Sequence, residues 1–561
     1  MTNLNLHPII LELLNKRGYS TEKDVSEFLS SKPRKTYDPF LLHNMAEGVD
    51  LVLSAVENDE RICVYGDYDA DGVTATSVLL EFLSHLTPNL SYYIPSRFDE
   101  GYGLNKTAME KISAAGVGLV VTVDCGSVSR EEVEYGKKLG LEIVVTDHHQ
   151  AELETLPACP VINPNQPDCT YPFKGLAGCG VAFKLAQAIG KTIDLPPSTY
   201  NDTLDLVAVG TIADVMPLVD ENRTLVKYGL LRLNSGSRLA LRELTTGIGL
   251  KLGEVRAFNV SFGIAPHINA AGRIKAARLG VKLFRSQDED EIKEIIDIVK
   301  ECNSMRKDLQ NQTFLKCVDK VEGSIKENGR LDNFLLIQLD DVHEGVTGIA
   351  AGKVKDKYYR PVAVVTPTDD GKYKGTGRSI EGIDLHRFLS NFSNLFERFG
   401  GHKAACGFTI AGDNLTAFRE GIAEKMEELI SEQPDLFTRT WTWDFEAAPE
   451  DLTVELAYEL NLFEPCGKGN ETPVFAVNGF INRLTSMGRE GQYRRFLLND
   501  DNGRSSLQCV SFALEGGSMD ELREGMKVKA IGSLNLNSWN GRVTAQFNVR
   551  KIFPAECLTL R

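Results

Sequence analysis

The sequence predicts an α/β protein of several domains: a first domain with a mostly parallel sheet, a second and smaller α/β domain, and a C-terminal β-barrel. Three observations support this prediction. Apolar strand-like runs alternate with helical segments from residue 60 to about 165, and this alternation returns after residue 331. The last hundred residues contain several short strands in close succession, which is typical of a small closed barrel.

The first α/β region follows short helical segments at 1–45 and belongs to a domain that we expect at 46–285. Its strands are predicted at 61–66, 90–94, 118–123 and 141–146. Helices are predicted at 72–86, 105–114 and 130–139, and residues 170–285 are largely helical. Ligands of such sheets bind beyond the carboxyl ends of the strands, so the loops after these strands are candidate site positions.

A long helix is predicted between the two α/β domains, at 286–330. Residues 288–328 contain no proline, and apolar side chains recur among many charged ones at helical spacing. A continuous helix of this length would extend for about 60 Å. It either packs on one core along its length or acts as a spacer between two lobes.

The second α/β domain is expected at 331–435, and a barrel of the OB type at 440–561. Strands are predicted at 333–340, 360–366 and 406–412, and helices at 347–359 and 385–399. The whole chain has a net charge of −16, but residues 467–561 carry 13 Lys and Arg against 9 Asp and Glu. A weakly basic barrel on an acidic body permits local binding of nucleic acid.

Composition excludes several classes of protein. Hydrophobic residues make up 42% and charged residues 25% of the 561 residues, as in ordinary globular proteins. No apolar run approaches the roughly 20 residues that span a bilayer, so we expect no membrane partner. Eleven cysteines without a CxxC pair, and an N-terminus without a signal-peptide pattern, indicate the cytoplasm rather than a disulfide framework or a zinc knuckle.

Acidic and histidine side chains follow three predicted strands of the first domain, in YGDYDADG (65–72), VDCG (123–126) and TDHH (146–149). Because parallel strands end at the same edge of a sheet, these side chains should converge. A further aspartate follows late in an apolar helix, in GTIADVMPL (210–218). The candidate residues are Asp67, Asp69, Asp71, Asp124, Asp147, His148, His149 and Asp214.

Clustered carboxylates repel one another, and a divalent cation allows them to remain ionised. Carboxylates with one or two imidazoles suit Mn²⁺ or Mg²⁺. Two such cations activate a water and stabilise a phosphoryl oxygen, so the residues by themselves predict phosphoryl hydrolysis. A calcium loop would need a glutamate at its twelfth position, where this chain has Val78. Helix N-capping would explain a single aspartate, but not three loops on successive strands.

These motifs resemble those of the DHH phosphoesterase superfamily. Further segments resemble the RecJ family within it, whose members are single-strand-specific 5′→3′ DNA exonucleases: FDEGYGL (98–104), PHINAAGRI (266–274), GTGRS (375–379), GGHKAACGF (400–408) and FEPCGKGNETPVF (463–475). The resemblance runs from about residue 40 to the C-terminus. It implies a DHH domain, a long connecting helix, a DHH-associated domain and an OB-fold.

The resemblance also implies roles for individual residues. Two divalent cations, Mn²⁺ or Mg²⁺, would be held by Asp69, Asp71, Asp124, His148 and Asp214, with Asp67 a ligand or the partner of one. His149 would act with Asp69, Asp71 and Asp124 in catalysis by orienting a ligand or stabilising the transition state, and Asp147 orients rather than ligates. Substrate phosphate would contact Arg97, Arg273, Arg378, Ser379 and His402.

Several of these assignments have alternatives. Glycines at 375 and 377 predict a tight loop that presents Arg378 to phosphate, rather than an ordinary surface arginine. For Arg97 and Arg273, the sequence leaves open whether the side chain contacts phosphate directly. For Tyr102, stacking on a base and packing in the core are both open. Candidates for holding the strand on the barrel are Arg494, Arg495, Arg504, Lys527, Lys529 and Trp539, and each can equally be a solvated surface residue.

The main hypothesis is a processive, metal-dependent exonuclease of recombination and repair that degrades single-stranded DNA from the 5′ end to 5′-mononucleotides. Two lobes would enclose a groove too narrow for duplex, and the barrel would bind the strand behind it. The alternative is a DHH phosphodiesterase acting on cyclic dinucleotides or short oligoribonucleotides, which would not need the barrel. A catalytically silent scaffold is a third hypothesis, against which the complete carboxylate and histidine set argues. Expected partners are single-stranded DNA and a single-stranded-DNA-binding protein or a helicase, and we expect a monomer.

Overall fold

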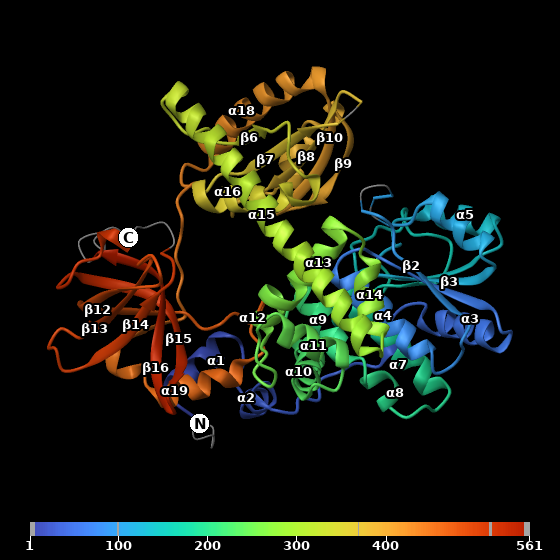
Figure 1. Cartoon of the computed structure of the whole chain (residues 1–561), viewed down its shortest axis with the longest axis horizontal. Helices are drawn as coiled ribbons and strands as arrows, with labels where there is room; N and C mark the ends of the chain where they lie inside the picture. Colours follow the sequence, from blue (N-terminus) through green and yellow to red (C-terminus); the bar gives the residue numbers. More distant parts are fainter. Residues whose placement is uncertain (1–5, 98–99, 102, 369, 515–518, 555–561) are drawn as a thin grey trace. The chain divides into compact units, whose positions relative to one another are not determined.

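The computed structural model describes residues 6–97, 100–101, 103–368, 370–514 and 519–554 (Figure 1). Tyr102 lies outside the described residues. The chain forms two compact units: Met1–Gly272 with Ala276–Val299 and Thr442–Arg561, and Arg273–Lys275 with Lys300–Trp441. Among the described helices, none is long and apolar enough to cross a membrane.

The first sheet has five parallel strands in the order β2-β1-β3-β4-β5. They are β1 (Arg61–Gly66), β2 (Leu90–Tyr93), β3 (Val117–Val123), β4 (Glu142–Thr146) and β5 (Val161–Ile162). Successive side chains of a strand point to opposite faces, so both faces of β1 are apolar: Ile62 and Val64 lie in one core, and Cys63 and Tyr65 in another. The order places β1, β3 and β4 side by side, so their carboxyl ends adjoin.

Helices cover both faces of this sheet, as Figure 1 shows and as the sequence predicts. On one face lie α3 (Met45–Glu57), α4 (Ala70–Leu83) and α7 (Gly178–Thr192), and on the other α5 (Lys106–Ala114) and α6 (Arg130–Lys138). A largely helical region follows, with α8 (Ser198–Asn201), α9 (Leu204–Ala213), α10 (Asp220–Ser235), α11 (Leu239–Gly247), α12 (Ala257–Asn259), the π-helical turn η2 (Val260–Ile264), α13 (Ala265–Ile274) and α14 (Arg278–Arg285). The helix α9 is apolar on all sides and buried, which is why the aspartate at its end is held in a fixed place.

The long helix α15 (Glu289–Asn328) is continuous over 40 residues, as predicted. Its first part contributes Ile292, Ile295 and Val299 to the main core of the first unit. Further along, Cys317 and Val321 belong to a core of the second unit. The helix therefore combines both predicted roles, because it packs on a core at each end and joins the two units.

The second unit contains the mixed sheet β6-β7-β8-β10-β9. Its strands are β6 (Leu335–Gln338), β7 (Val362–Pro367), β8 (Lys372–Arg378), β9 (Phe396–His402) and β10 (Ala405–Ala411). Only β6 and β7 are parallel among its described pairs. The accompanying helices are α16 (Glu344–Tyr358), α17 (Leu385–Ser390) and α18 (Leu415–Glu432), with the short turns η3 (Ser393–Leu395) and η4 (Gly412–Asn414).

Two predictions for this unit are wrong. The helix predicted at 385–399 ends at Ser390, and its last residues form β9 instead. Phe396 packs there against the rings of Phe408 and Phe418 (centroid distances 4.8 and 5.1 Å), so strand pairing and aromatic packing override the helical pattern. The tight loop predicted at GTGRS is also absent, because residues 375–378 form the end of β8 and Ser379 follows the strand directly.

The glycines of β8 have a packing role. A Cβ atom on Gly375 would lie 2.2 Å from the ring of Phe408, and one on Gly377 would lie 2.9 Å from Leu385. Glycine at these positions lets side chains of neighbouring elements lie directly against the strand.

The C-terminal region forms a closed barrel of five long strands, as predicted. They are β12 (Phe475–Met487), β13 (Tyr493–Asn499), β14 (Ser506–Ser511), β15 (Lys527–Trp539) and β16 (Arg542–Pro554), with β11 (Phe445–Ala447) added at an edge. The order β12-β13-β14-β16-β15 closes through pairing of β12 with β15. Before the barrel lie η5 (Pro449–Asp451), α19 (Val454–Leu460) and η6 (Asn461–Phe463), and the turn η7 (Met519–Glu521) precedes β15.

The barrel shares its core with the N-terminal helices α1 (Pro8–Lys16) and α2 (Glu22–Leu29). Arg223 of α10 ties these parts together from a buried position. Its guanidinium donates hydrogen bonds to the carbonyl oxygens of Phe28 (3.0 Å), Leu462 (3.1 Å) and Phe463 (2.9 Å), and it covers the ring of Phe28 at 4.0 Å. The segment before the barrel also contacts the first domain, since the N–H of Leu218 donates to the carbonyl of Lys468 at 2.8 Å.

We expect Arg223→Met to destabilise the first unit by about 3 kcal/mol, because it leaves several buried carbonyl oxygens without donors while keeping most of the side-chain volume. Thermal melts should show a lower Tm for the variant. Arg256→Met is the control, because the Arg256 side chain is half exposed and makes a long ion pair with Glu464 (3.8 Å). Equal melting temperatures for the two variants would contradict this role of Arg223.

Candidate metal centre

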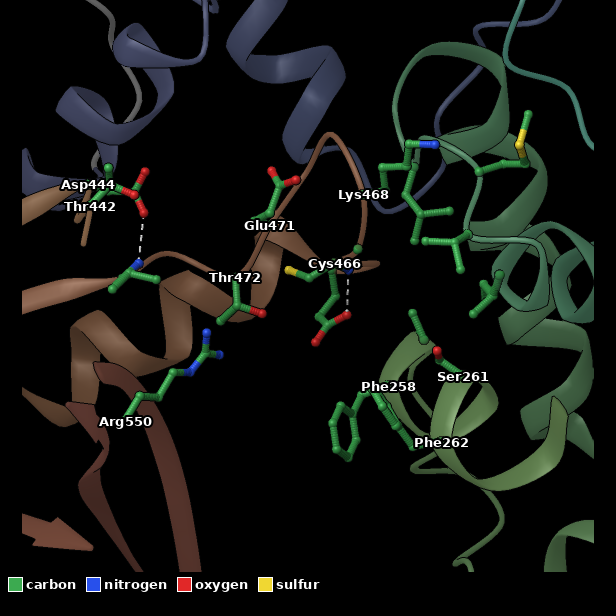
Figure 2. Close-up of a pocket in the computed structure, with 18 of the residues that line it drawn as sticks. Phe258, Ser261, Phe262, Thr442, Asp444, Cys466, Lys468, Glu471, Thr472 and Arg550 are labelled. Atoms are coloured by element: carbon green, nitrogen blue, oxygen red, sulfur yellow. Dashed lines mark hydrogen bonds between the residues drawn. The ribbon is translucent and has the colours of Figure 1, made fainter. Parts of the chain in front are cut away.

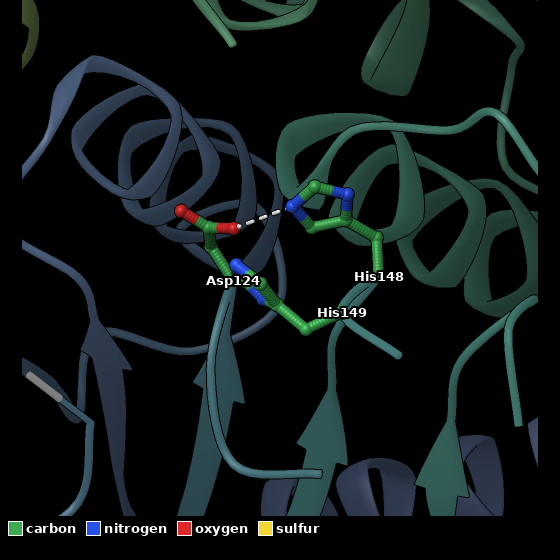
Figure 3. Close-up of side chains that lie close together, drawn as sticks. All are labelled: Asp124, His148 and His149. Carbon is green, nitrogen blue, oxygen red and sulfur yellow. Dashed lines mark ion pairs between the residues drawn. The ribbon is translucent and has the colours of Figure 1, made fainter. Parts of the chain in front are cut away.

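The acidic and histidine residues of the sequence motifs meet at one edge of the parallel sheet. Asp67 and Asp69 follow β1, and Asp124 follows β3. His148 and His149 follow β4, and Figure 3 shows both imidazoles next to the Asp124 carboxylate. Asp71 lies in the first turn of α4 and Asp214 directly follows α9. The predicted convergence is therefore present.

His148 lies at the centre of this cluster. Its Nε2 atom is 3.1 Å from Asp124 Oδ1, 3.6 Å from Asp214 Oδ2 and 3.9 Å from Asp71 Oδ2. Three sets of possible ligand atoms each lie within 4.8 Å of one another. They are Asp67, Asp69 and Asp124; Asp71, His148 and Asp214; and Asp124, His148 and His149.

The donor set fits divalent cations. Oδ1 of Asp67 and Oδ1 of Asp124 are buried and accept no hydrogen bond, although buried carboxylate oxygens normally have partners. Burial and the neighbouring carboxylates raise the pKa of Asp67 and Asp124 well above the ordinary range, and raise the pKa of Asp214 to about 8. A bound cation would account for both features. It would coordinate the oxygens that accept no hydrogen bond, and its charge would offset the repulsion between the carboxylates.

Two of the aspartates are fixed by backbone N–H groups. Asp69 caps α4, and its Oδ1 accepts from the N–H groups of Asp71 (2.9 Å) and Gly72 (3.1 Å). The two oxygens of Asp71 accept from Gly178 (2.6 Å) and Cys179 (2.9 Å) at the start of α7. Helix N-termini favour negative charge, so the carboxylates are held in place before any cation binds.

Gly178 is a site residue that the sequence motifs did not identify. A Cβ atom at this position would lie 2.5 Å from the Cβ and 2.7 Å from Oδ1 of Asp124. Gly210 is similar, because its Cβ would lie 2.7 Å from Asp71 Oδ1. Both helices approach the carboxylates closely only because these residues are glycine. Gly210 is the glycine of the GTIADVMPL motif, so the sequence did contain a signal for this site residue.

The two histidines have different surroundings. Asp147 Oδ1 lies 2.7 Å from His149 Nδ1 and accepts from the N–H of His148 (2.7 Å) and His149 (3.2 Å), while Oδ2 accepts from Ser127 N–H (2.9 Å). Both carboxylate oxygens of Asp147 are thus already hydrogen-bonded by groups of the surrounding loops. Asn163 and Asn165, which the motifs missed, donate to the carbonyls of His149 (2.8 Å) and His148 (2.6 Å).

These surroundings give the histidines different charge states. Burial lowers the pKa of His148 despite the nearby carboxylates, and this favours the neutral imidazole that binds cations. Burial also lowers the pKa of His149, but the hydrogen bond and charge of Asp147 outweigh it and raise the pKa to about 9. His149 is therefore a cation at neutral pH, and about a third of its side chain is exposed.

The residues predicted to bind substrate phosphate lie in both units. Arg97 lies near the cluster, because its charge lowers the pKa of Asp67, and its guanidinium covers the ring of Tyr68 at 4.9 Å. In the second unit, Arg273 donates to the carbonyl of Gly345 (2.9 Å), and the Ser379 hydroxyl donates to that of Ile383 (2.8 Å). Arg378 and His402 both pair with Ala405 and so flank it at one end of the sheet.

The barrel residues divide into two groups. Arg495 and Trp539 line one cavity of about 680 Å³, together with Phe512 and Arg542, which the sequence interpretation did not include. Trp539 is 74% and Phe512 is 56% exposed. Elsewhere, Lys527 pairs with Asp501 (2.9 Å) and Lys529 with Glu446 (3.0 Å), whereas Arg494 donates to the carbonyl of Tyr493 (3.1 Å). Arg504 lies in an exposed turn.

Comparison with known proteins covers all three parts of the chain. Family models match at residues 61–211 (DHH family, N-terminal domain), 331–428 (DHHA1 domain) and 443–551 (RecJ OB domain). The single-stranded-DNA-specific exonuclease RecJ of Bacillus subtilis (strain 168) is 36% identical over 556 residues, which cover 99% of this chain and 69% of that protein. The chain belongs to the RecJ family. The RecJ of Escherichia coli (strain K12) is 30% identical, over 98% of this chain and 96% of that protein.

A solved RecJ structure has the same fold. The crystal structure of RecJ from Thermus thermophilus in complex with Mn²⁺ matches with a TM-score of 0.82 and 29% identity. The match covers 98% of this chain and 76% of that chain. The α/β class, the DHH and DHHA1 domains and the OB barrel are thus confirmed for this member of the RecJ family.

Proposed function

We propose that this member of the RecJ family is a metal-dependent exonuclease that degrades single-stranded DNA in the 5′→3′ direction to 5′-mononucleotides, in recombination and repair. The observation that carries the proposal is the cluster of carboxylates and histidines, which includes two buried carboxylate oxygens that accept no hydrogen bond, in a family of single-stranded-DNA-specific exonucleases. The barrel with its exposed Trp539 supports a polymeric substrate rather than the cyclic dinucleotides or short oligoribonucleotides of the alternative.

The cations of this site are Mn²⁺ or Mg²⁺, and relatives in the family have been solved with each. We assign Asp67, Asp69, Asp71, Asp124, His148 and Asp214 to hold two of them. When bound, such cations supply positive charge that polarises a phosphoryl oxygen and lowers the pKa of a water.

The chain's own residues position the substrate. His149, protonated at neutral pH and partly exposed beside the cluster, donates a hydrogen bond to an oxygen of the phosphate that is being cut. Asp147 fixes the ring through Nδ1 and keeps it charged, so it is a positioning residue. Arg97, Arg273, Arg378, Ser379 and His402 remain predicted phosphate contacts, and Arg494, Lys527 and Lys529 remain predicted contacts of the strand.

End-labelled 20-mers test the reaction. With Mn²⁺ or Mg²⁺, a 3′-labelled single strand should shorten progressively, a 5′-labelled one should release labelled mononucleotide at once, and a blunt duplex should persist. Equal cutting of duplex and single strand, or attack at the 3′ end, would contradict the proposal. Faster hydrolysis of a dinucleotide than of the 20-mer would favour the alternative.

On the barrel, we expect Trp539→Ala combined with Arg495→Ala to raise the Kd for a 20-mer about 10- to 100-fold. The reason is the loss of one stacking ring, worth about 1–3 kcal/mol, and of one phosphate contact. Fluorescence anisotropy in EDTA measures binding without cutting. Trp539→Phe is the matched control, because it keeps a ring and should keep most of the affinity. An unchanged Kd in the double variant would exclude this face of the barrel.

The proposal also covers the partners, the oligomeric state and the cellular location of the protein. Single-stranded DNA is the polymer partner, and we propose a monomer in the cytoplasm that acts beside a single-stranded-DNA-binding protein or a helicase. Sedimentation of the purified protein and pull-down with each purified partner test these points.

A further inference from the structure

A cavity of about 590 Å³ lies next to the metal centre, within the first compact unit (Figure 2). One wall is built from Ile212, Val215 and Met216, the neighbours of Asp214, so the cavity lies beside that ligand. Another wall comes from the 258–262 turn, and the opposite side from the segment 464–474 and the barrel strand that carries Arg550. Cleavage of DNA at the metal centre does not by itself assign a role to this cavity.

Two exposed phenylalanines form a flat apolar surface in the cavity. Phe258 is 66% and Phe262 is 71% exposed, and their ring centroids lie 4.7 Å apart with the rings tilted by 35°. Phe262 lies on a turn that is anchored in the core by the buried Val260 and Ile264, and Phe258 lies on the short helix α12 directly before it. This turn is π-helical, a rare geometry that occurs frequently at functional sites. Exposing two adjacent rings is unfavourable unless something covers them.

Two cationic side chains of the cavity can contact an anion, and three carboxylates also line it. Lys468 and Arg550 line the cavity, and among the residues that the structure describes neither forms a salt bridge. Each of the carboxylates accepts a hydrogen bond from a backbone N–H: Asp444 from Val474 (2.8 Å), and Glu464 from Cys466 (2.9 Å). Glu471 likewise accepts from the N–H of Gly469 (3.0 Å).

Lys468 connects the cavity to the metal centre. It lies in the segment that precedes the barrel, and its backbone carbonyl is bonded to the N–H of Leu218, four residues after Asp214. Lys468 also lines the cavity together with Val215, the residue that follows Asp214. A phosphate at the cations and a phosphate near Lys468 would therefore be neighbours on one strand.

We propose that this cavity is a nucleotide subsite, in which Phe258 and Phe262 stack on bases next to the bond being cut while Lys468 and Arg550 neutralise the adjoining phosphates. The inference rests on the proposed function, since it assumes a single strand at the metal centre. Stacking on rings accepts every base, and cationic contacts follow the backbone, so the subsite holds DNA without reading its sequence. It keeps the strand in place between successive cuts.

Binding of abasic DNA tests the subsite separately from catalysis. Fluorescein-labelled 20-mers, each with one abasic site at a position from 2 to 10, are titrated with the full chain in EDTA. In the wild type, Kd should rise about tenfold at one or two adjacent positions, where a base has lost its stacking partner. In Phe258→Leu/Phe262→Leu, the intact 20-mer should bind about tenfold more weakly, and the abasic penalty at those positions should disappear.

Matched variants separate stacking from folding. Phe258→Tyr/Phe262→Tyr keeps the rings and should reproduce the wild-type profile, as should Phe40→Leu, which removes an exposed ring outside the cavity. Lys468→Gln should lower the slope of log Kd against log salt by about one. A flat abasic profile in the wild type, or the same profile in the leucine variant, overturns the proposal. Failure of the proposed function would appear elsewhere, as an absence of cutting by the wild type with Mn²⁺.

Discussion

Replacing Asp124 with asparagine should abolish nuclease activity and at the same time stabilise the metal-free protein. Activity should fall by at least about 10³-fold, since the amide is a poor ligand and a bound cation contributes several kcal/mol to catalysis. Stability should rise because Asp124 is buried among carboxylates, with an oxygen that accepts no hydrogen bond. Asparagine has nearly the same shape and carries no charge.

The pH dependence has a defined sign. The pKa of Asp124 is higher in the folded protein than in the unfolded chain, so the folded state binds more protons and loses stability as pH rises above the unfolded value of about 4. In EDTA, Asp124→Asn should therefore raise the Tm more at pH 8 than at pH 5, corresponding to about 1–3 kcal/mol at the higher pH. With Mn²⁺ present the order should reverse, because only the wild type gains the full binding energy of the cation.

Asp205→Asn is the control for this experiment. Asp205 is also buried in the first domain, but its Oδ2 lies 2.9 Å from the cationic guanidinium of Arg238, whereas the imidazole next to Asp124 belongs to His148, whose pKa is lowered by burial. Replacement of Asp205 should lower the Tm in EDTA, since it weakens a buried ion pair. If Asp124→Asn lowers the Tm as much as Asp205→Asn does, the cluster is not under electrostatic strain and the argument for a cation site loses its physical basis.

His149→Gln should lower kcat by about 10²- to 10³-fold while Mn²⁺ binding is kept. The imidazolium is held by Asp147 rather than by the carboxylates of the cluster, so its loss removes a hydrogen-bond donor to the phosphate and not the principal imidazole ligand. Single-turnover cutting of a 20-mer measures the chemical step, and Mn²⁺ titration by electron paramagnetic resonance measures the binding.

Two further variants distinguish the roles of the histidines. His148→Gln should lose both activity and Mn²⁺ affinity, because its Nε2 lies among three carboxylates. Asp147→Asn should resemble His149→Gln, and combining these two changes should cost little more than either alone, as expected for residues that act as a unit. A His149→Gln protein that binds Mn²⁺ as weakly as His148→Gln would make His149 a ligand instead.

Much of the site could be predicted because its residues are local signals. DYDADG, VDCG and TDHH each place a charged side chain directly after an apolar β-branched run, and parallel strands end at one edge. The second unit was less predictable. Residues 396–399 fit the helical pattern predicted at 385–399, yet they begin β9, where Phe396 packs against the rings of Phe408 and Phe418. Such a preference depends on residues distant in the chain.

The sequence by itself determined the reaction class and the α/β and barrel parts, and it nominated the candidate metal ligands, since these depend on short motifs and on the alternation of apolar residues. Only the tertiary structure decided that Asp71 is held by the N-terminus of α7, and that Gly178 leaves room for Asp124. It also decided that Lys468 and the neighbours of Asp214 line one cavity, and that Phe258 and Phe262 face it. The physical reason is distance along the chain. Contacts between residues hundreds of positions apart depend on how whole elements pack, and no local pattern records them.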